Sequence, residues 1–249
     1  MILTFSDFGH CGPYLGLMRR SIARVWPEAT VIDLMCDVPA FNPRAGAYLL
    51  QALRPWVGRG DVVLAVVDPG VGSERHPMAL EADGAWFVGP DNGLLERVGT
   101  TAEHLRCWGI RWRPDSLSPS FHGRDLFAPV AAALARDAEA AVPVYLEPRI
   151  WRSRGWSPSW PAVIYVDHYG NAMTGLRASA VAPGSTIAAA DQTLSPARTF
   201  SDVAPGVAFW YANSLGLVEI AVNQGSAAEC LGLAPGDPVW FSSLAPEAD

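Results

Sequence analysis

Residues 61–75 read DVVLAVVDPGVGSER, an apolar and β-branched run that gives way to a polar segment beginning at Asp68. A run of this kind, bounded by Asp, Gly and Pro, is typical of a strand buried on both faces of a sheet. Two similar runs precede it at residues 2–6 and 29–34, and one follows at 85–88. We therefore predict a series of buried strands with polar loops at their ends.

Helical patterns alternate with these strands. Residues 13–25 and 43–56 place apolar side chains at intervals of three and four residues, and each opens with a proline, which suits the first turn of a helix. A further helix is expected at 124–136, with Pro129 in its early turns. The β-α-β-α-β order predicts an α/β fold over residues 1–145, in which a mainly parallel sheet is flanked by helices.

The composition and the periodicity of the sequence change after this domain. Residues 143–160 are rich in Pro, Trp and Arg and show neither helical nor strand periodicity, so we interpret 146–160 as a linker. Beyond it, short apolar runs alternate with Gly, Pro and Asn turns, as in small antiparallel sheets. These runs lie at 162–166, 186–190, 207–212 and 217–222. Residues 161–249 are therefore predicted to form a smaller, β-rich C-terminal domain.

Composition excludes several chemistries. All 18 basic residues are arginines, so neither a lysine Schiff base nor a GxxxxGK[ST] phosphate loop is possible. The HExxH and GxSxG signatures of zinc proteases and serine hydrolases do not occur. The cysteines show no CxxC pair and no zinc-site spacing, so we expect free, buried thiols. They are Cys11, Cys36, Cys107 and Cys230.

Charge and hydropathy indicate which partners and which cellular compartment to expect. The net charge of −7 is spread along the chain without an extended basic cluster, which argues against a nucleic-acid partner. No apolar run is long enough for a membrane span. The first residues, MILTFSDFG, lack the basic and long apolar segments of a signal peptide. We expect a cytoplasmic protein without a membrane partner.

Polar clusters stand at the ends of predicted strands, where open α/β sheets bind their ligands. They are residues 6–9, 68–75, 89–93 and 121–125. A turn is the favoured interpretation for Asp91, whereas Asp7 and Asp68 directly follow apolar strands and fit a ligand role about as well as a turn. His122 precedes a helix whose amides suit an anion or a polarised oxygen, although a plain capping loop also fits.

Seven segments, taken in order, resemble the motif series of the S-adenosylmethionine hydroxide adenosyltransferases, relatives of the fluorinase and the chlorinase. They are TFSDFG, PYLGLMR, VVDPGVGSER, VGPDNGLL, SFHGRDLFAPVAA, VDHYGNAMT and NSLGLVEIAVNQGSA. The resemblance extends from Thr4 to about Val239. It implies an S-adenosyl-L-methionine (SAM) hydrolase, which uses water to give adenosine and L-methionine.

The resemblance also implies a catalytic set. Asp68, Arg75 and His122 match the acid, guanidinium and imidazole that surround the attacking water in this family. Water has a pKa of about 15.7, so it must be oriented and its developing negative charge stabilised. Which of the three side chains takes the proton stays open. The sulfonium of SAM is already an excellent leaving group, so no metal and no cofactor is expected.

Substrate contacts follow from the same comparison. Asp7 matches the residue that accepts hydrogen bonds from the ribose hydroxyls, and Phe41 matches an aromatic residue beside the sugar and base. Asp167 is expected to meet the methionine ammonium group. Further contacts are expected from Phe8, Asn92, Asn171, Ser214 and Asn223. Family members are homotrimers with sites at subunit interfaces, which is the expectation here.

Departures from the family pattern leave alternatives open. Gly12 stands where Asp is common, Cys36 where His is frequent, and Leu215 where the fluorinase has an arginine. One alternative is a SAM-dependent halogenase of the chlorinase kind, but Asp68 replaces an aromatic residue of the halogenases and its charge would repel a halide. The other is a non-catalytic SAM or adenosine-binding protein, which has no need of Asp68, Arg75 and His122 together.

Overall fold

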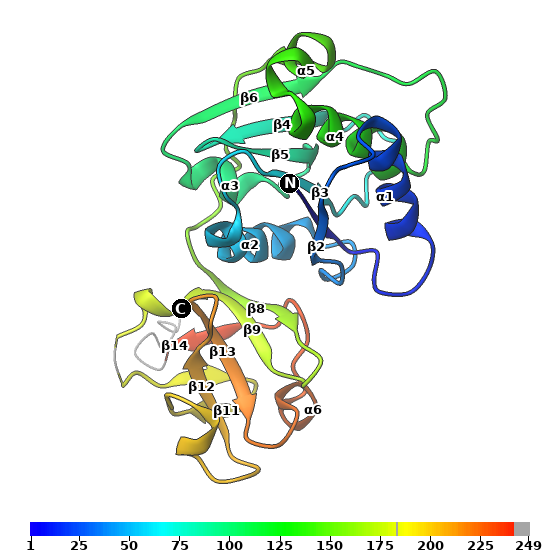
Figure 1. The fold of residues 1–249 in the computed structure, drawn as a ribbon. Coiled ribbons are helices and arrows are strands. Elements are labelled where there is room, and N and C mark those ends of the chain that lie inside the picture. Colours follow the sequence, from blue (N-terminus) through cyan, green and yellow to red (C-terminus); the bar gives the residue numbers. More distant parts are fainter. Residues whose placement is uncertain (183, 242–249) are drawn as a thin grey trace. The chain divides into compact units, whose positions relative to one another are not determined.

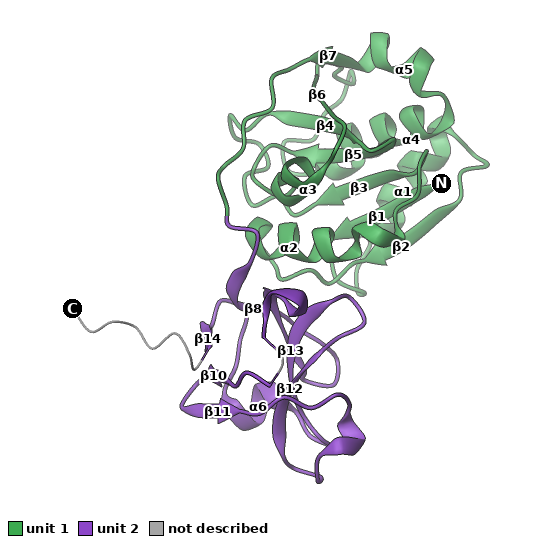
Figure 2. Ribbon diagram, turned by 90° about the vertical axis from the view of Figure 1, so that its left-hand side faces the viewer, with its two compact units in different colours: residues 1–156 green, residues 157–249 purple. Residues whose placement is uncertain are grey.

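The computed structural model describes residues 1–182 and 184–241. The chain divides into two compact units, Met1–Trp156 and Ser157–Asp249 (Figure 2). Each unit has a hydrophobic core of its own. The predicted α/β class with a second, β-rich part is confirmed.

The first unit is built on a seven-stranded sheet with the order β2-β1-β3-β5-β4-β6-β7 (Figure 1). Strands β2, β1, β3 and β5 run parallel, whereas β4, β6 and β7 are added in antiparallel pairings. The strands are β1 (Ile2–Ser6), β2 (Val31–Met35), β3 (Val62–Val66), β4 (Pro77–Ala82), β5 (Ala85–Pro90), β6 (Leu105–Ile110) and β7 (Leu146–Pro148).

Helices cover both faces of this sheet. Ile2 and Leu64 point into a core shared with Met18 of α1 and Val130 of α4, whereas Phe5 lies near Gly46 of α2. Successive residues of a strand face opposite sides of the sheet, so β1 packs against α1 and α4 on one face and against α2 on the other. The helices are α1 (Tyr14–Val25), α2 (Pro43–Leu53), α3 (Glu96–Thr101), α4 (Ala128–Arg136) and α5 (Ala138–Tyr145), with a 3-10 turn at Arg54–Trp56.

The parallel strands set the position of two acidic side chains. Ser6 of β1 is paired with Val66 of β3, so Asp7 and Asp68 leave the sheet at the same carboxyl edge. A π-helical turn, Gly123–Phe127, leads into α4 directly after His122, and the Ala128 amide donates to the carbonyl of Gly123. Pro129 has no amide hydrogen and lies in the first turn of α4. These elements bring their loops to one edge of the sheet.

The elements differ from the predictions in a few places. The helix expected at 43–56 ends as an α-helix at Leu53 and finishes as the 3-10 turn that contains Pro55. Strands β4 and β6 were not predicted. We predicted no regular structure in residues 143–160, and this prediction was wrong for the first of them. Helix α5 continues to Tyr145 despite Pro143, and β7 pairs with β6.

The second unit contains two small antiparallel sheets. The four-stranded sheet has the order β12-β13-β9-β8, and the three-stranded sheet has the order β11-β10-β14. The side chain of Ser226 caps the start of the short helix α6 (Ala227–Leu231), and Gly232, in the left-handed conformation, follows its end. The strands are β8 (Trp160–Val166), β9 (Ala172–Arg177), β10 (Ile187–Ala189), β11 (Gln192–Leu194), β12 (Ala208–Ala212), β13 (Leu217–Val222) and β14 (Val239–Phe241), with 3-10 turns at Ala178–Ala180 and Phe200–Asp202.

The state of the cysteines and the membrane prediction were two further expectations from the sequence. The cysteines are free thiols as predicted, but Cys11 and Cys230 are exposed, so the expected burial holds only for Cys36 and Cys107. Within residues 1–182 and 184–241, none of the helices combines the length and the apolar character that crossing a bilayer requires.

A stability test follows from the packing of β5 against β3. A Cβ at Gly89 would lie 2.3 Å from the Ala65 carbonyl oxygen, so Gly89→Ala must push two central strands apart. We expect a loss of about 3 kcal/mol or more in the free energy of unfolding, measured by urea denaturation. Gly16→Ala is the matched control, because Gly16 lies exposed on α1 with nothing within 4 Å of its Cβ position. Alanine there should be neutral or stabilising by up to about 1 kcal/mol, and equal losses in the two variants would contradict this packing.

Candidate active site

Two loops of the first unit bring Asp68, Arg75 and His122 into direct contact, because Asp68 and Arg75 lie in the loop between β3 and β4 and His122 lies in the loop that leads to α4. The Arg75 Nε atom donates to Asp68 Oδ1 at 2.9 Å, and its Nη2 atom donates to Asp68 Oδ2. The same Nη2 atom lies 2.8 Å from His122 Nδ1. The structure therefore joins the three residues that the resemblance singled out.

The loop that carries Asp68 and Arg75 is held by its own hydrogen bonds. The Val71 amide donates to the Asp68 carbonyl, and the Ser73 hydroxyl donates to the Gly70 carbonyl at 2.7 Å. Gly72 has a φ of +80°, and a Cβ there would lie 2.7 Å from the Pro119 carbonyl oxygen. Glycine at this position lets the loop approach the segment that leads to His122.

Arg75 is buried between its partners. Only 9% of its side chain and 6% of that of Asp68 are exposed, and its guanidinium lies over the Phe127 ring at 5.2 Å. A buried guanidinium needs a carboxylate with matching geometry, and the two-point contact with Asp68 supplies it. Arg75 is therefore placed to hold Asp68 and His122 in fixed orientations.

The contact with Arg75 also fixes the chemistry of His122. An arginine side chain can only donate hydrogen bonds, so the His122 Nδ1 atom accepts and the proton of the neutral ring is on Nε2. Burial, and then the positive charge of Arg75, lower the pKa of His122 below its ordinary value. At neutral pH His122 is thus a neutral ring whose Nε2–H is available as a hydrogen-bond donor.

Asp68 and His122 line a cavity of about 220 Å³ in the first unit. This volume is below the roughly 300–1,000 Å³ of most small-molecule sites, so the cavity has room for part of a nucleoside-sized ligand. Arg75 is not among the lining residues and lies behind the wall. The other lining side chains that matter here are Asp7, Phe8, Tyr14, Phe41, Ser120 and Phe121.

Aromatic rings form one wall of this cavity. The ring centroids of Phe8, Tyr14 and Phe121 lie 5.4 to 5.7 Å from one another. A Cβ at Gly123 would lie 3.4 Å from both Phe8 and Phe121, so a larger residue there would press on this wall. Aromatic faces of this kind bind planar or apolar groups of a ligand. Tyr14 and Phe121 were not predicted as site residues.

Asp7 and Phe41 lie together at the cavity. The Phe41 amide donates to Asp7 Oδ2 at 3.0 Å. Phe41 has a φ of 59°, a left-handed conformation that is strained for a phenylalanine, and 77% of the residue is exposed. Burial raises the pKa of Asp7, and the charge of Asp68 adds to this, although the Phe41 amide acts in the opposite direction. The cavity is thus lined by two carboxylates, Asp7 and Asp68, that are shielded from solvent.

The second unit has a larger cavity of about 780 Å³. Asp167, Asn171 and Ser214 line it, as do Tyr169, Phe200, Tyr211, Asn213 and Glu219. Asp167 Oδ1 accepts from the amides of Tyr169 and Asn171, both at 2.8 Å, and its Oδ2 accepts from the Asn171 side chain at 2.9 Å. The carboxylate therefore shapes its own loop and also faces the cavity.

Glu219 is a buried acid of this cavity that sequence reasoning missed. It lies on β13 opposite Tyr211 on β12, and its carboxylate accepts from the Tyr211 hydroxyl and, at 2.6 Å, from Asn213 Nδ2. Burial raises the pKa values of both Glu219 and Tyr211. The signal was an acidic residue inside the apolar run LVEIAV, which is unusual for a core strand without a functional or pairing partner.

Two expected contact residues are used elsewhere. The Asn92 side chain donates to the Val67 carbonyl at 2.8 Å and accepts from the Leu94 amide at 3.1 Å. The Asn223 side chain donates to the Val203 carbonyl at 2.7 Å. Neither residue lines the two cavities described above. The structure places both as supports of loops, with Asn92 holding the strand end from which Asp68 emerges.

The fold and the site define a two-part α/β and β protein with an acid, a guanidinium and an imidazole at the carboxyl edge of its parallel strands. Residues 2–142 match the SAM hydroxide adenosyltransferase N-terminal domain, and residues 161–240 match the C-terminal domain of the same family. The chain belongs to the SAM hydroxide adenosyltransferase family, as the sequence resemblance predicted.

Similar proteins agree over nearly the full length. The chain is 38% identical to an (R)-S-adenosyl-L-methionine hydrolase of Thermus thermophilus, covering 96% of this chain and 98% of the relative. It is 36% identical to the hydrolase of the same name from Salinispora tropica, with 93% and 94% covered. A crystal structure of an uncharacterized conserved protein from Thermotoga maritima has a TM-score of 0.83 at 29% identity and covers 97% of this chain and 99% of its own.

The protonation of His122 provides a test of the site. An ordinary histidine is half protonated near pH 6.5, whereas we expect His122 to be largely neutral there, with its proton on Nε2, because burial and Arg75 disfavour the cation. Nitrogen-15 NMR of the imidazole ring as a function of pH measures both properties. In Arg75→Met the pKa of His122 should rise, because the Asp68 charge is no longer compensated. A wild-type His122 that titrates at or above pH 6.5 would contradict the proposed hydrogen-bond arrangement.

Proposed function

We propose that this protein is a SAM hydrolase, which converts SAM and water to adenosine and L-methionine. The observation that carries the proposal is the direct contact of Asp68, Arg75 and His122 beside a cavity that also contains Asp7. The family membership and the names of the relatives support it. The relatives' names also support the R configuration at the sulfur of the substrate.

The proposed reaction is an in-line displacement at the ribose C5′ atom. A bond forms between the water oxygen and C5′, while the C5′–S bond breaks and its electron pair returns to sulfur, giving the neutral thioether of methionine. The water must lose one proton as it attacks. No step of this balance needs a metal ion, an oxidant or a reductant, because the positive sulfonium already makes sulfur a good leaving group.

Each of the three side chains has a different proposed role toward the attacking water. Asp68 faces the cavity with carboxylate lone pairs that Arg75 leaves free, so it is the group proposed to accept the proton. His122 donates through Nε2 and orients the attacking oxygen. Arg75 acts as a positioning residue that holds both, since it lies behind the cavity wall. Groups fixed in this way need little reorganisation as charge develops.

The substrate contacts are proposed for two cavities. In the first unit the Asp7 carboxylate binds the ribose hydroxyls, and Phe8 and Phe41 pack beside the sugar and base. In the second unit Asp167, with Asn171 and Ser214, is proposed to bind the methionine end, where the carboxylate complements the α-ammonium group. Hydroxyl hydrogen bonds would relieve the desolvation of Asp7.

Halide transfer to the same carbon is the rival reaction. Asp7 and Asp68 both line the first cavity, and two carboxylates create a field that repels an anion such as chloride. Water carries no charge and can donate a hydrogen bond to either acid. The geometry therefore favours hydrolysis over halogenation. A protein that only bound SAM or adenosine would not need Arg75 and His122 in contact with each other next to Asp68.

Incubation of the purified protein with SAM tests the function. We expect adenosine and methionine to appear in equal amounts, with oxygen-18 from labelled water in the 5′-hydroxyl of adenosine. A 5′-chloro nucleoside formed in the presence of chloride would show halogenation, and tight binding without products would show a sensor. Adenosine without the label would remove the displacement by water at C5′.

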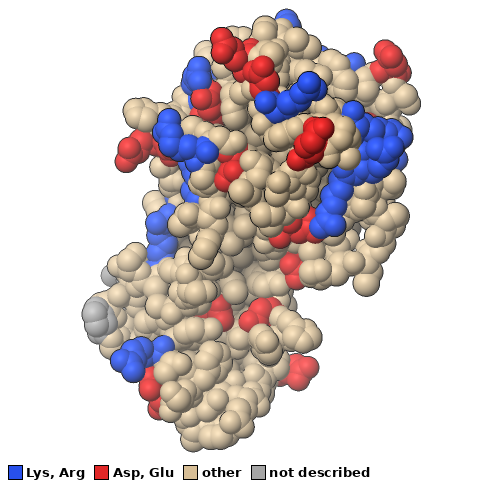
Figure 3. Space-filling model, in the orientation of Figure 1, with Lys and Arg blue, Asp and Glu red and all other residues tan. Residues whose placement is uncertain are grey.

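Assembly and compartment are part of the proposal. We propose a homotrimer in the cytoplasm, as the family resemblance implies. On the face shown in Figure 3 acidic residues lie among the arginines over much of the first unit, and arginines gather in one patch at its right-hand side. We propose that nucleic acid is not a partner, because the net charge of the chain is −7. Light scattering coupled to size exclusion should give three times the 26.7 kDa mass of the chain.

Replacement of the two proposed acids should separate catalysis from binding. Asp68→Asn keeps the shape of the side chain but removes its charge, and we expect kcat to fall by about 100-fold or more with a small change in KM. Asp167→Asn, which lies in the second cavity, should raise KM and leave kcat nearly intact. Steady-state kinetics with SAM measure both. Equal effects of the two changes on KM alone would contradict the role of Asp68.

Asp7 is expected to trade stability for binding. Its raised pKa means that the folded protein disfavours the charged form, so above the ordinary pKa of an aspartate this group costs stability, and below that pKa the cost disappears. Asp7→Asn should therefore leave the melting temperature at pH 7 unchanged or higher, while KM for SAM rises by about tenfold or more. Thermal denaturation at pH 7 and kinetics test this pair of effects. A destabilised variant with unchanged KM would show that Asp7 is structural.

A further inference from the structure

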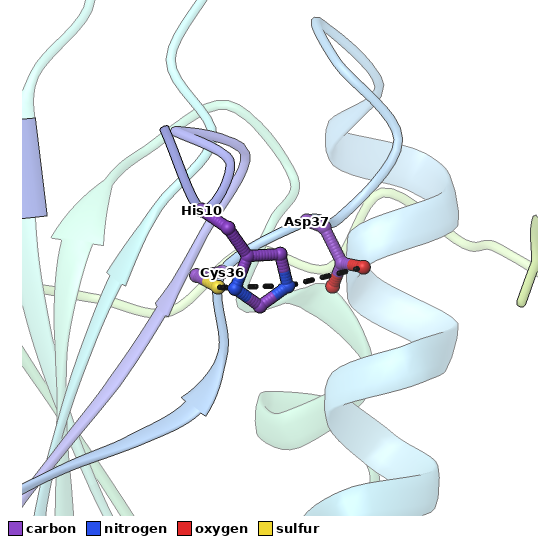
Figure 4. A group of neighbouring side chains, drawn as sticks. All are labelled: His10, Cys36 and Asp37. Carbon is purple, nitrogen blue, oxygen red and sulfur yellow. Dashed lines mark hydrogen bonds and ion pairs between the residues drawn. The ribbon is translucent and has the colours of Figure 1, made fainter. Parts of the chain in front are cut away.

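The loops at the carboxyl edge of the parallel strands are joined to one another in pairs. After β1 and β2, the His10 ring contacts both Cys36, whose Sγ atom lies 3.2 Å from Nδ1, and Asp37 (Figure 4). The loop that follows β3, residues 68–75, is joined instead to residues 91–93, which follow β5. We refer to these two segments as the site loop and the supporting turn. The site loop carries two of the three proposed catalytic side chains, so its support matters for the proposed reaction.

The supporting turn holds both ends of the site loop. At one end, the Asn92 side chain donates to the carbonyl of Val67, which directly precedes the loop, at 2.8 Å. At the other end, the Asp91 amide donates to the carbonyl of His76, which directly follows the loop, at 2.9 Å. A displacement of the supporting turn therefore reaches the site loop from both sides.

The supporting turn is itself covered by residues 149–156, which we call the connecting segment. This segment has no regular secondary structure, yet the Trp156 ring lies on Gly93, where a Cβ would be 2.6 Å from the Trp156 Cη2 atom. The Arg154 Cδ atom lies 3.2 Å from the same Cβ position, and the Arg154 Nη2 atom donates to the Asp91 carbonyl at 3.3 Å. Only glycine allows this close approach of the two side chains to the turn.

The connecting segment is anchored to α3, the helix that follows the supporting turn. Glu96, only 1% exposed, accepts from the Ser153 hydroxyl at 2.6 Å and from the Arg154 amide at 2.9 Å. The buried Arg97 guanidinium donates to the Trp156 carbonyl at 3.1 Å. Buried charged groups are costly to leave without hydrogen bonds, so these contacts hold the backbone of the segment in one place.

We propose that the connecting segment positions the proposed catalytic set, with Trp156 and Arg154 acting through the supporting turn on the site loop. Neither side chain lines the first cavity, so both are positioning residues. A misplacement of about 1 Å at reacting groups can lower a rate by about 100-fold, so a loosened turn should lower turnover more than it weakens binding. For its kinetic readout the inference rests on the proposed function.

Steady-state kinetics with SAM test these positioning roles. Trp156→Ala should lower kcat by at least about tenfold with KM changed by less than about threefold, and Arg154→Ala should lower kcat in the same way by about threefold or more. Trp156→Phe, which keeps a ring over the supporting turn, should keep most of kcat. Trp151→Ala and Arg152→Ala are the matched controls, because they remove the same kinds of side chain from the same segment, and Trp151 packs on α3 instead. Both controls should keep kcat close to that of the wild type.

A double-mutant cycle tests the route through the supporting turn. Asn92→Ala removes the hydrogen bond to the Val67 carbonyl. If Trp156 acts through this contact, Trp156→Ala should lower kcat much less in Asn92→Ala than in the wild type, because coupled residues are not additive. Arg154→Ala serves in place of Trp156→Ala if the latter does not fold, since 44% of the Arg154 side chain is exposed. Full additivity would overturn the route.

The titration of His122 gives a readout that does not depend on turnover. Burial, and then the charge of Arg75, lower the pKa of His122. In Trp156→Ala this pKa, measured by nitrogen-15 NMR, should rise toward the ordinary value of about 6.5 as the site loop loosens, whereas Trp151→Ala should leave it unchanged. Wild-type kcat and wild-type titration in Trp156→Ala, or an equal loss of kcat in Trp151→Ala, would overturn the proposal. If the wild type does not turn over SAM, the proposed function fails, and the NMR comparison still decides this inference.

Discussion

The buried guanidinium of Arg75 is the interaction on which the first unit's site depends. It has a carboxylate on one side and an imidazole on the other, and its plane rests on Phe127. A charge in this position is tolerated only because Asp68 neutralises it through two hydrogen bonds. The contact of Arg75 with His122 Nδ1 imposes one tautomer on the imidazole. The contacts of Arg75 therefore both stabilise this edge of the sheet and determine which hydrogen bonds its side chains can make.

This arrangement gives each acid a different environment. Asp68 is held in an ion pair, whereas Asp7 has only backbone hydrogen bonds, among them one from the Phe41 amide, and burial desolvates it. The first is suited to work on a nucleophile of fixed orientation, and the second to accept hydrogen bonds from a ligand that replaces lost solvent. In the second unit Glu219 is buried and satisfied by Tyr211 and Asn213. Its role there is to order the cavity wall rather than to carry free charge.

Much of the first unit was predictable because its strands and helices have strong periodicity. The placement of Asp7 beside Asp68 follows from the parallel order of β1 and β3, whose carboxyl ends meet at one edge. The position of Arg75 behind the cavity wall was not predictable, since it depends on the turn at Gly72. The pairing of Tyr211 with Glu219 depends on the register of two strands, and the roles of Asn92 and Asn223 depend on which carbonyls lie within reach. The cluster of His10 with Cys36 joins loops 26 residues apart, which local spacing does not reveal.

The π-helical turn at Gly123–Phe127 has a consequence for how this protein can vary. A π turn contains one residue more than the α turn it replaces, so the chain before it is rotated with respect to the helix that follows. Loss of a single residue there would restore the α register and turn His122 by about 100° around the helix axis. A one-residue deletion would therefore carry the imidazole away from Arg75 while α4 kept its place. The length of this segment is thus constrained in addition to the identity of Gly123 and Phe127, which pack against the site.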